Sequence, residues 1–154
     1  MTRRQFSSRF IWTISGAAIG ILQAAGDEVQ YVGGTMSGMD GAEGLFDTSD
    51  AKIIKFSSKK GAFEIPYQGI TSVEYGQKAG RRIGVAIVIS PVFLLSKKRK
   101  HFLTVGFKDA KDQPQAVVLE LPKGTPRKII AIIEARSGVK CEYESEEAKK
   151  NVHG

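Results

Sequence analysis

The stretch His101–Leu121, HFLTVGFKDAKDQPQAVVLEL, decides the fold because it holds two alternating runs joined by a polar turn. In His101–Phe107 and in Gln115–Leu121, successive side chains fall on opposite faces of an extended chain. Lys108–Pro114 between them is rich in Lys, Asp, Gln and Pro, a composition typical of a hairpin loop. The stretch therefore predicts a pair of antiparallel strands.

The same pattern occurs towards the N-terminus as short apolar or alternating runs. These runs are Gln30–Val32, Gly44–Phe46, Lys52–Phe56, Ala62–Ile65 and Ile70–Tyr75. The breaks between them are made of Gly, Asp, Ser and Lys, which favour turns because they tolerate left-handed backbone or bond their own backbone. We expect a series of antiparallel strands.

One helix is predicted after the hairpin, over about residues 125–137. Thr125 suits the N-cap, Pro126 suits the first helical position, and Ser137-Gly138 supplies a stop. The helical spacing of Ile129, Ile132, Ile133 and Arg136 gives one apolar stripe that needs a sheet to cover. Residues 139–144 are expected to add a short extended segment, and residues 145–154 to form a polar tail.

These elements predict one domain over residues 27–144, mainly β with one C-terminal α-helix. Short strands followed by one amphipathic helix resemble the pleckstrin-homology-like family, including its GRAM-like and bacterial members. The strings Ile65–Tyr67, Ile70–Gly76, Ser96–Thr104 and Glu134–Gly138 also resemble a set of small exported bacterial proteins. The resemblance implies a bent antiparallel sheet or barrel, one open end plugged by the helix, and it implies no catalytic residues.

Residues 1–26 resemble an export signal. Arg3, Arg4 and Arg9 precede an uncharged run over residues 10–26 that ends in small residues. Thr2–Phe6 resembles the start of a twin-arginine signal, although Ser7 and Ser8 depart from that motif. A retained membrane anchor is the alternative, but the run is shorter than the roughly 20 residues of a spanning helix. We expect a signal helix and a periplasmic or extracellular, or membrane-associated, domain.

The charge of the chain limits the kinds of partner it could bind, and its cysteine content limits its disulfides. The chain has 23 basic and 16 acidic residues, and the excess falls from seven to four without the three leader arginines. Such an excess favours anionic partners only where it is clustered. Cys141 is the only cysteine, so no internal disulfide forms, and a lone cysteine of this kind is expected to be buried.

The predicted site is an uncharged run, Ile83–Leu95, with cations on both sides. The residues expected to contact an anionic ligand or lipid are Arg81, Arg82, Lys97, Lys98, Arg99 and Lys100. The residues expected to contact membrane or a partner are Val92, Phe93, Leu94 and Leu95. Basic residues at an anionic membrane contribute about 1 kcal/mol each. Two other interpretations stay open: the run is a pair of buried strands, and the cations are a solvated strand entrance.

Catalytic and metal motifs are missing from the sequence. There is no Gly-x-Ser-x-Gly elbow, the two histidines are His101 and His153, and no cluster has metal-ligand spacing. The aromatic spacing after the basic cluster does not match an RNA-binding strand motif. The sequence thus predicts a non-enzymatic binding domain of the bacterial envelope, without cofactor, metal or nucleic acid. A protein-interaction module is the alternative, and a hydrolase with an unrecognised site the remote one.

Overall fold

A computed structural model describes residues 26–77, 88–89 and 100–154. Within these ranges nine strands form one bent sheet in the order β4-β3-β2-β1-β8-β7-β5-β9, and β6 pairs with β1. The strands are β1 (Asp27–Gly34), β2 (Glu43–Asp47), β3 (Ile53–Ser58), β4 (Gly61–Pro66), β5 (Ile70–Gly76), β6 (Val88–Ile89), β7 (His101–Lys108), β8 (Pro114–Leu121) and β9 (Cys141–Tyr143). The pairing is antiparallel except between β5 and β9.

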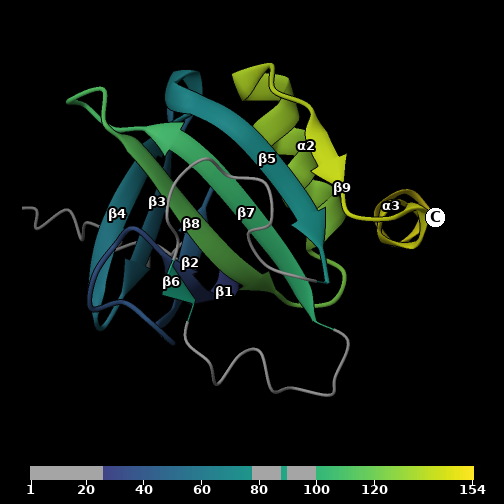
Figure 1. The fold of residues 1–154 in the computed structure, drawn as a ribbon, viewed down its shortest axis with the longest axis horizontal. Helices are drawn as coiled ribbons and strands as arrows, with labels where there is room; N and C mark the ends of the chain where they lie inside the picture. The colour runs from purple at the N-terminus through teal and green to yellow at the C-terminus, as the bar shows by residue number, and fades with distance from the viewer. Residues whose placement is uncertain (1–25, 78–87, 90–99) are drawn as a thin grey trace, which may run out of the picture.

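The predicted hairpin is confirmed as β7 and β8, which cross the middle of the sheet (Figure 1). Their register runs from His101 opposite Leu121 to Lys108 opposite Pro114. The Asp109 carboxylate fixes the turn, because its Oδ1 accepts hydrogen bonds of 2.9 Å from the backbone N–H groups of residues 111 and 113. The other predicted strands are present too, within a few residues of their expected ends.

The alternation of the hairpin separates two apolar clusters. The main core takes one face of the hairpin, with Leu103, Val105 and Leu119 fully buried. The other face, which we call the outer face, carries a smaller cluster of Val32, Phe102 and Val118 with Ile89 of β6 packed against it. Both faces of the central strands are therefore buried, as expected of near-continuous apolar strands.

The predicted helix is α2 (Pro126–Ser137). Ile129, Ile130 and Ile133 are buried in the main core, whereas Ile132 is only partly buried. Thr125 stands at the N-cap position, but its hydroxyl donates to the Pro122 carbonyl and no side chain caps the helix. The predicted stop is confirmed: Gly138 has a φ of 75°, the left-handed conformation that favours glycine at a helix end.

The prediction of a polar tail over residues 145–154 was wrong. Residues Glu146–His153 form a second helix, α3, whose N-terminus is capped by the Ser145 hydroxyl accepting from the Ala148 N–H at 3.1 Å. Ala148 and Val152 are one helical turn apart and buried in the main core. Two apolar residues at that spacing, with a cap, are enough to hold this helix against the domain.

The coarse fold class is confirmed as mainly β with a C-terminal helix on an open, bent sheet. In the described residues β4 pairs with β3 alone, and the short 3-10 helix η1 (Tyr67–Gly69) turns the chain from β4 into β5. Among the same residues no helix has the length and apolar character needed to cross a membrane. The predicted signal helix over residues 1–26 lies outside the described residues, apart from Gly26.

Candidate functional site

Most of the predicted contact residues lie outside the described part of the chain. These are Arg81, Arg82, Val92, Phe93, Leu94, Leu95, Lys97, Lys98 and Arg99. Lys100 lies within it, and so do Val88 and Ile89 from the uncharged run. The described part of the predicted site is therefore Lys100, Val88 and Ile89, together with the end of β5 and the start of β7.

Lys100 is held by a carboxylate of the neighbouring strand. Its Nζ donates to Glu120 Oε2 at 2.7 Å, and the two side chains are only 20% and 25% exposed. Partial burial makes such a pair stronger than one at the open surface, since less water screens it. An anionic ligand at Lys100 would thus compete with Glu120 for the ammonium group.

The described part of the uncharged run is a strand. Val88 and Ile89 form β6, which pairs antiparallel with Gly34 and Gly33 of β1. β6 takes up the edge of β1 beyond Gln30, where the pairing with β2 ends. Ile89 packs on the outer apolar cluster. For Ile89 the structure favours the buried-strand interpretation, and the remainder of Ile83–Leu95 apart from the backbone of Val88 lies outside the described residues.

The two ends of the β5–β7 connection, residues 77–100, lie on adjacent strands. β5 ends at Gly76, which is paired with Phe102 near the start of β7. The backbone N–H of Gln77 donates to Glu144 Oε2 at 2.7 Å and so fixes the first residue of the connection. Its two ends are therefore held together at one end of the sheet.

The connection also carries all of the positive charge excess of the domain. Residues 77–100 include seven Lys or Arg and no Asp or Glu, whereas the rest of residues 27–154 has 13 basic and 16 acidic residues. Without the connection the domain would be slightly acidic. The sequence thus separates charge between this connection and the body of the protein, by which we mean the rest of residues 27–154.

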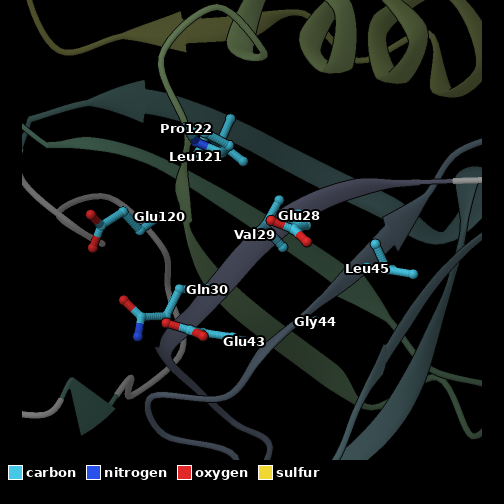
Figure 2. Close-up of a pocket in the computed structure, with 9 residues that line it drawn as sticks. All are labelled: Glu28, Val29, Gln30, Glu43, Gly44, Leu45, Glu120, Leu121 and Pro122. Carbon is cyan, nitrogen blue, oxygen red and sulfur yellow. The ribbon is translucent and has the colours of Figure 1, made fainter.

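An acidic hollow of about 440 Å³ lies on the outer face beside Lys100. Figure 2 shows Glu28 and Gln30 from β1 and Glu43 from β2, with Glu120 from the end of β8 at its other side. The register explains this grouping, because Gln30 is paired with both Glu43 and Glu120 across its two neighbouring strands. Its chemistry suits a cationic group. Sequence reasoning missed it, since pairing of β1 with β8 has no local signal.

Each of the two histidines bonds a tyrosine hydroxyl, His101 that of Tyr75 and His153 that of Tyr143. His101 Nδ1 is 2.6 Å from the Tyr75 hydroxyl, so it bonds a phenol and not a serine or thiol. Cys141 is 8% exposed, and burial raises its pKa to about 12, which leaves the thiol protonated. No group of three possible metal ligands occurs in the described ranges.

No protein-family model matches the chain, and no curated protein sequence matches it either.

Proposed function

We propose that this protein is a non-catalytic, pleckstrin-homology-like binding domain of the bacterial cell envelope that binds an anionic lipid surface through its β5–β7 connection. The observation that carries the proposal is the separation of charge between that connection and the body. Each Lys or Arg near an anionic membrane is worth about 1 kcal/mol, so a cluster of this size suffices for peripheral binding. The acidic body is repelled by the same surface, which favours an orientation with the connection towards it.

The order of the strands supports the family part of the proposal. β1 to β4 are neighbours in sequence order, β5, β7 and β8 form the other half, and β1 joins the halves by pairing with β8. A C-terminal helix then packs its isoleucines on the core. This arrangement supports the resemblance, which implies a bent sheet with one end covered by a helix and no shared catalytic residues.

Vesicle binding tests the proposal. The full chain is mixed with phosphatidylglycerol vesicles and with neutral vesicles, and the bound fraction is measured at rising salt. We expect binding to the anionic vesicles alone, weakening as salt screens the charges. The variant Lys97→Gln/Lys98→Gln/Arg99→Gln should bind about 100-fold more weakly, because it removes three charges worth about 1 kcal/mol each.

A matched control removes the same charge elsewhere. Lys52, Lys59 and Lys111 are exposed lysines on turns of the body, and their triple glutamine variant should bind nearly as well as the unaltered chain. Equal binding of the two triple variants would refute the role of the connection. The envelope location has a separate test, N-terminal sequencing of the protein recovered from cells, for which we expect a start near Asp27.

The acidic hollow favours a second candidate function, a protein-interaction module that receives a basic segment. Glu28 and Glu43 lie on its rim and are exposed. If this is the function, Glu28→Gln/Glu43→Gln should abolish recovery of a partner from envelope extracts, whereas Glu64→Gln/Glu146→Gln, which changes exposed residues elsewhere, should not. This candidate would be excluded if the Glu28→Gln/Glu43→Gln variant recovered the same proteins as the unaltered chain while the unaltered chain bound vesicles.

A further inference from the structure

We propose that a cleft between the start of β7 and the helices α2 and α3 binds a phosphate group. The cleft has a volume of about 260 Å³ and is lined by Tyr75, His101, Lys123, Arg127 and Asn151 among others. The inference deepens the proposed function and rests on it, because it names the chemical group on the anionic surface that a defined part of the domain would recognise.

Three basic side chains from three different segments meet in this cleft. His101 comes from β7, Lys123 from the turn after β8, and Arg127 from the first turn of α2. No Asp or Glu side chain is among the described residues that line it. The body has more acidic than basic residues, so a cleft whose described charged side chains are all basic stands out from it. Unlike the acidic hollow on the outer face, this cleft suits an anion.

Lys123 and Arg127, like most cations of the body, have no ion-pair partner among the described residues, and both side chains are exposed. Lys108 pairs with Asp112 and Lys128 pairs with Asp27, each through the lysine Nζ. Two like charges that line one cleft repel each other. A phosphate between them would remove that repulsion, and the planar guanidinium of Arg127 offers paired donors of the geometry that phosphate accepts.

His101 is prepared as a third donor by Tyr75. The two rings lie parallel, with 4° between their planes, and the Tyr75 hydroxyl bonds Nδ1 at 2.6 Å. Tyr75 is 1% exposed, and burial raises its pKa to about 12, so its hydroxyl keeps its proton. When that hydroxyl donates to Nδ1, the hydrogen of the neutral imidazole is on Nε2, the nitrogen left for a ligand. Tyr75 is thus a positioning residue for His101.

The N-terminal end of α2 also favours an anion in this cleft. The Thr125 hydroxyl donates to the Pro122 carbonyl, and no side chain accepts from the first N–H groups of the helix. Those groups and the positive end of the helix dipole favour an anion at the place where Arg127 lies. The cleft also adjoins the basic connection, because His101 directly follows Lys100 in the chain.

The test uses the full chain and three probes: inorganic phosphate, glycerol 3-phosphate, and phosphatidylglycerol vesicles. We expect the two soluble phosphates at about 10 mM to move the NMR resonances of the His101 ring, and acetate at the same concentration to leave them in place. Lys123→Gln/Arg127→Gln should weaken the binding of glycerol 3-phosphate at least about tenfold, as loss of two charge-assisted contacts predicts. The matched control, Lys59→Gln/Lys111→Gln, should bind as the unaltered chain does.

The vesicle arm distinguishes the source of the phosphate. Weaker vesicle binding by Lys123→Gln/Arg127→Gln assigns the cleft to a lipid headgroup, whereas unchanged vesicle binding assigns it to a soluble phosphate compound. The proposal is overturned if neither soluble phosphate moves the His101 resonances, or if the cleft variant and the control bind equally well. The variant altered at Lys97, Lys98 and Arg99 separates the two proposals: loss of vesicle binding only when the cleft is altered refutes the connection and keeps the cleft.

Discussion

Replacing Arg136 by methionine tests how α2 is fastened to the far end of the sheet. Its Nη1 donates to the Thr48 carbonyl, to the Asp50 carbonyl at 2.8 Å and to the Tyr67 hydroxyl at 3.0 Å. Its guanidinium carbon also lies 5.3 Å from the centre of the Tyr67 ring. One side chain thus joins the helix to the β2–β3 turn and to η1. Methionine keeps the apolar stem and removes the charged group.

The size of the effect follows from the surroundings of each partner. Thr48 is 7% exposed, so leaving its carbonyl without this donor costs about 1–3 kcal/mol. The bond to Asp50 is exposed and water replaces it at little cost, while the cation–π contact at an exposed site adds about 0.5–1 kcal/mol. The free energy of unfolding should therefore fall by about 1.5–4 kcal/mol in total, the sum of the lost carbonyl contact and the lost cation–π contact.

Equilibrium unfolding in urea, followed by circular dichroism, measures this change. With a urea dependence of about 2 kcal/mol per molar, the midpoint should fall by about 1–2 M. Arg127→Met is the matched control, since it removes a guanidinium from the same helix that has no described ion pair, and it should change stability by less than about 0.5 kcal/mol. Equal midpoints for the two variants would show that the contacts of Arg136 do not stabilise the fold. A Tyr67→Phe cycle then isolates the share of the phenol.

Three further predictions concern buried side chains and one closely packed glycine. Because burial holds the pKa of Cys141 at about 12, a thiol reagent at pH 8 should modify the protein only after urea unfolds it, and rapid labelling of the native chain would contradict this. Burial also raises the pKa values of Tyr75 and Tyr143 to about 12. The ordinary pKa values are 9.0 for cysteine and 10.0 for tyrosine, so as the pH rises Cys141, Tyr75 and Tyr143 lose their protons first in the unfolded chain. The free energy of unfolding should therefore fall between about pH 9 and 12, and a flat profile there would be inconsistent with the shifts. Gly44→Ala would place a Cβ against the Ser57 carbonyl oxygen and the Phe56 ring at the first pair of the β2–β3 register, so it should destabilise by about 2 kcal/mol or more, measured by the same urea titration.

Local patterns predicted the elements that depend on local chemistry. The β7–β8 hairpin follows from its alternation and turn, and α2 from its proline, isoleucines and closing Gly138. The second helix was missed because Ala148 and Val152 are too few to give a visible stripe, and their burial depends on the core beneath them. Ile130 was missed in a similar way, because the covered face of α2 is set by the bend of the sheet.

The surfaces were harder to predict than the elements, because they are made by residues far apart in sequence. The acidic hollow needs Gln30 of β1 beside Glu120 of β8, a pairing across most of the domain. The basic cleft needs His101, Lys123 and Arg127 from three segments. Charge runs such as residues 97–100 can be read directly from a sequence, whereas such groupings require the strand order.

The ion pair between Lys100 and Glu120 links the two candidate surfaces physically. Lys100 is the last residue of the basic connection, and Glu120 lies on the rim of the acidic hollow. An anion that draws Lys100 away leaves Glu120 partly buried without that partner, which strengthens the attraction of the hollow for a cation. Linkage makes the effect reciprocal, since a cation that neutralises Glu120 would weaken its hold on Lys100 and so favour an anion there by the same free energy. If both surfaces bind as proposed, binding at the basic connection and binding at the acidic hollow should be coupled through the 2.7 Å contact of Lys100 with Glu120, and Glu120→Gln should weaken that coupling while leaving Glu28 and Glu43 in place.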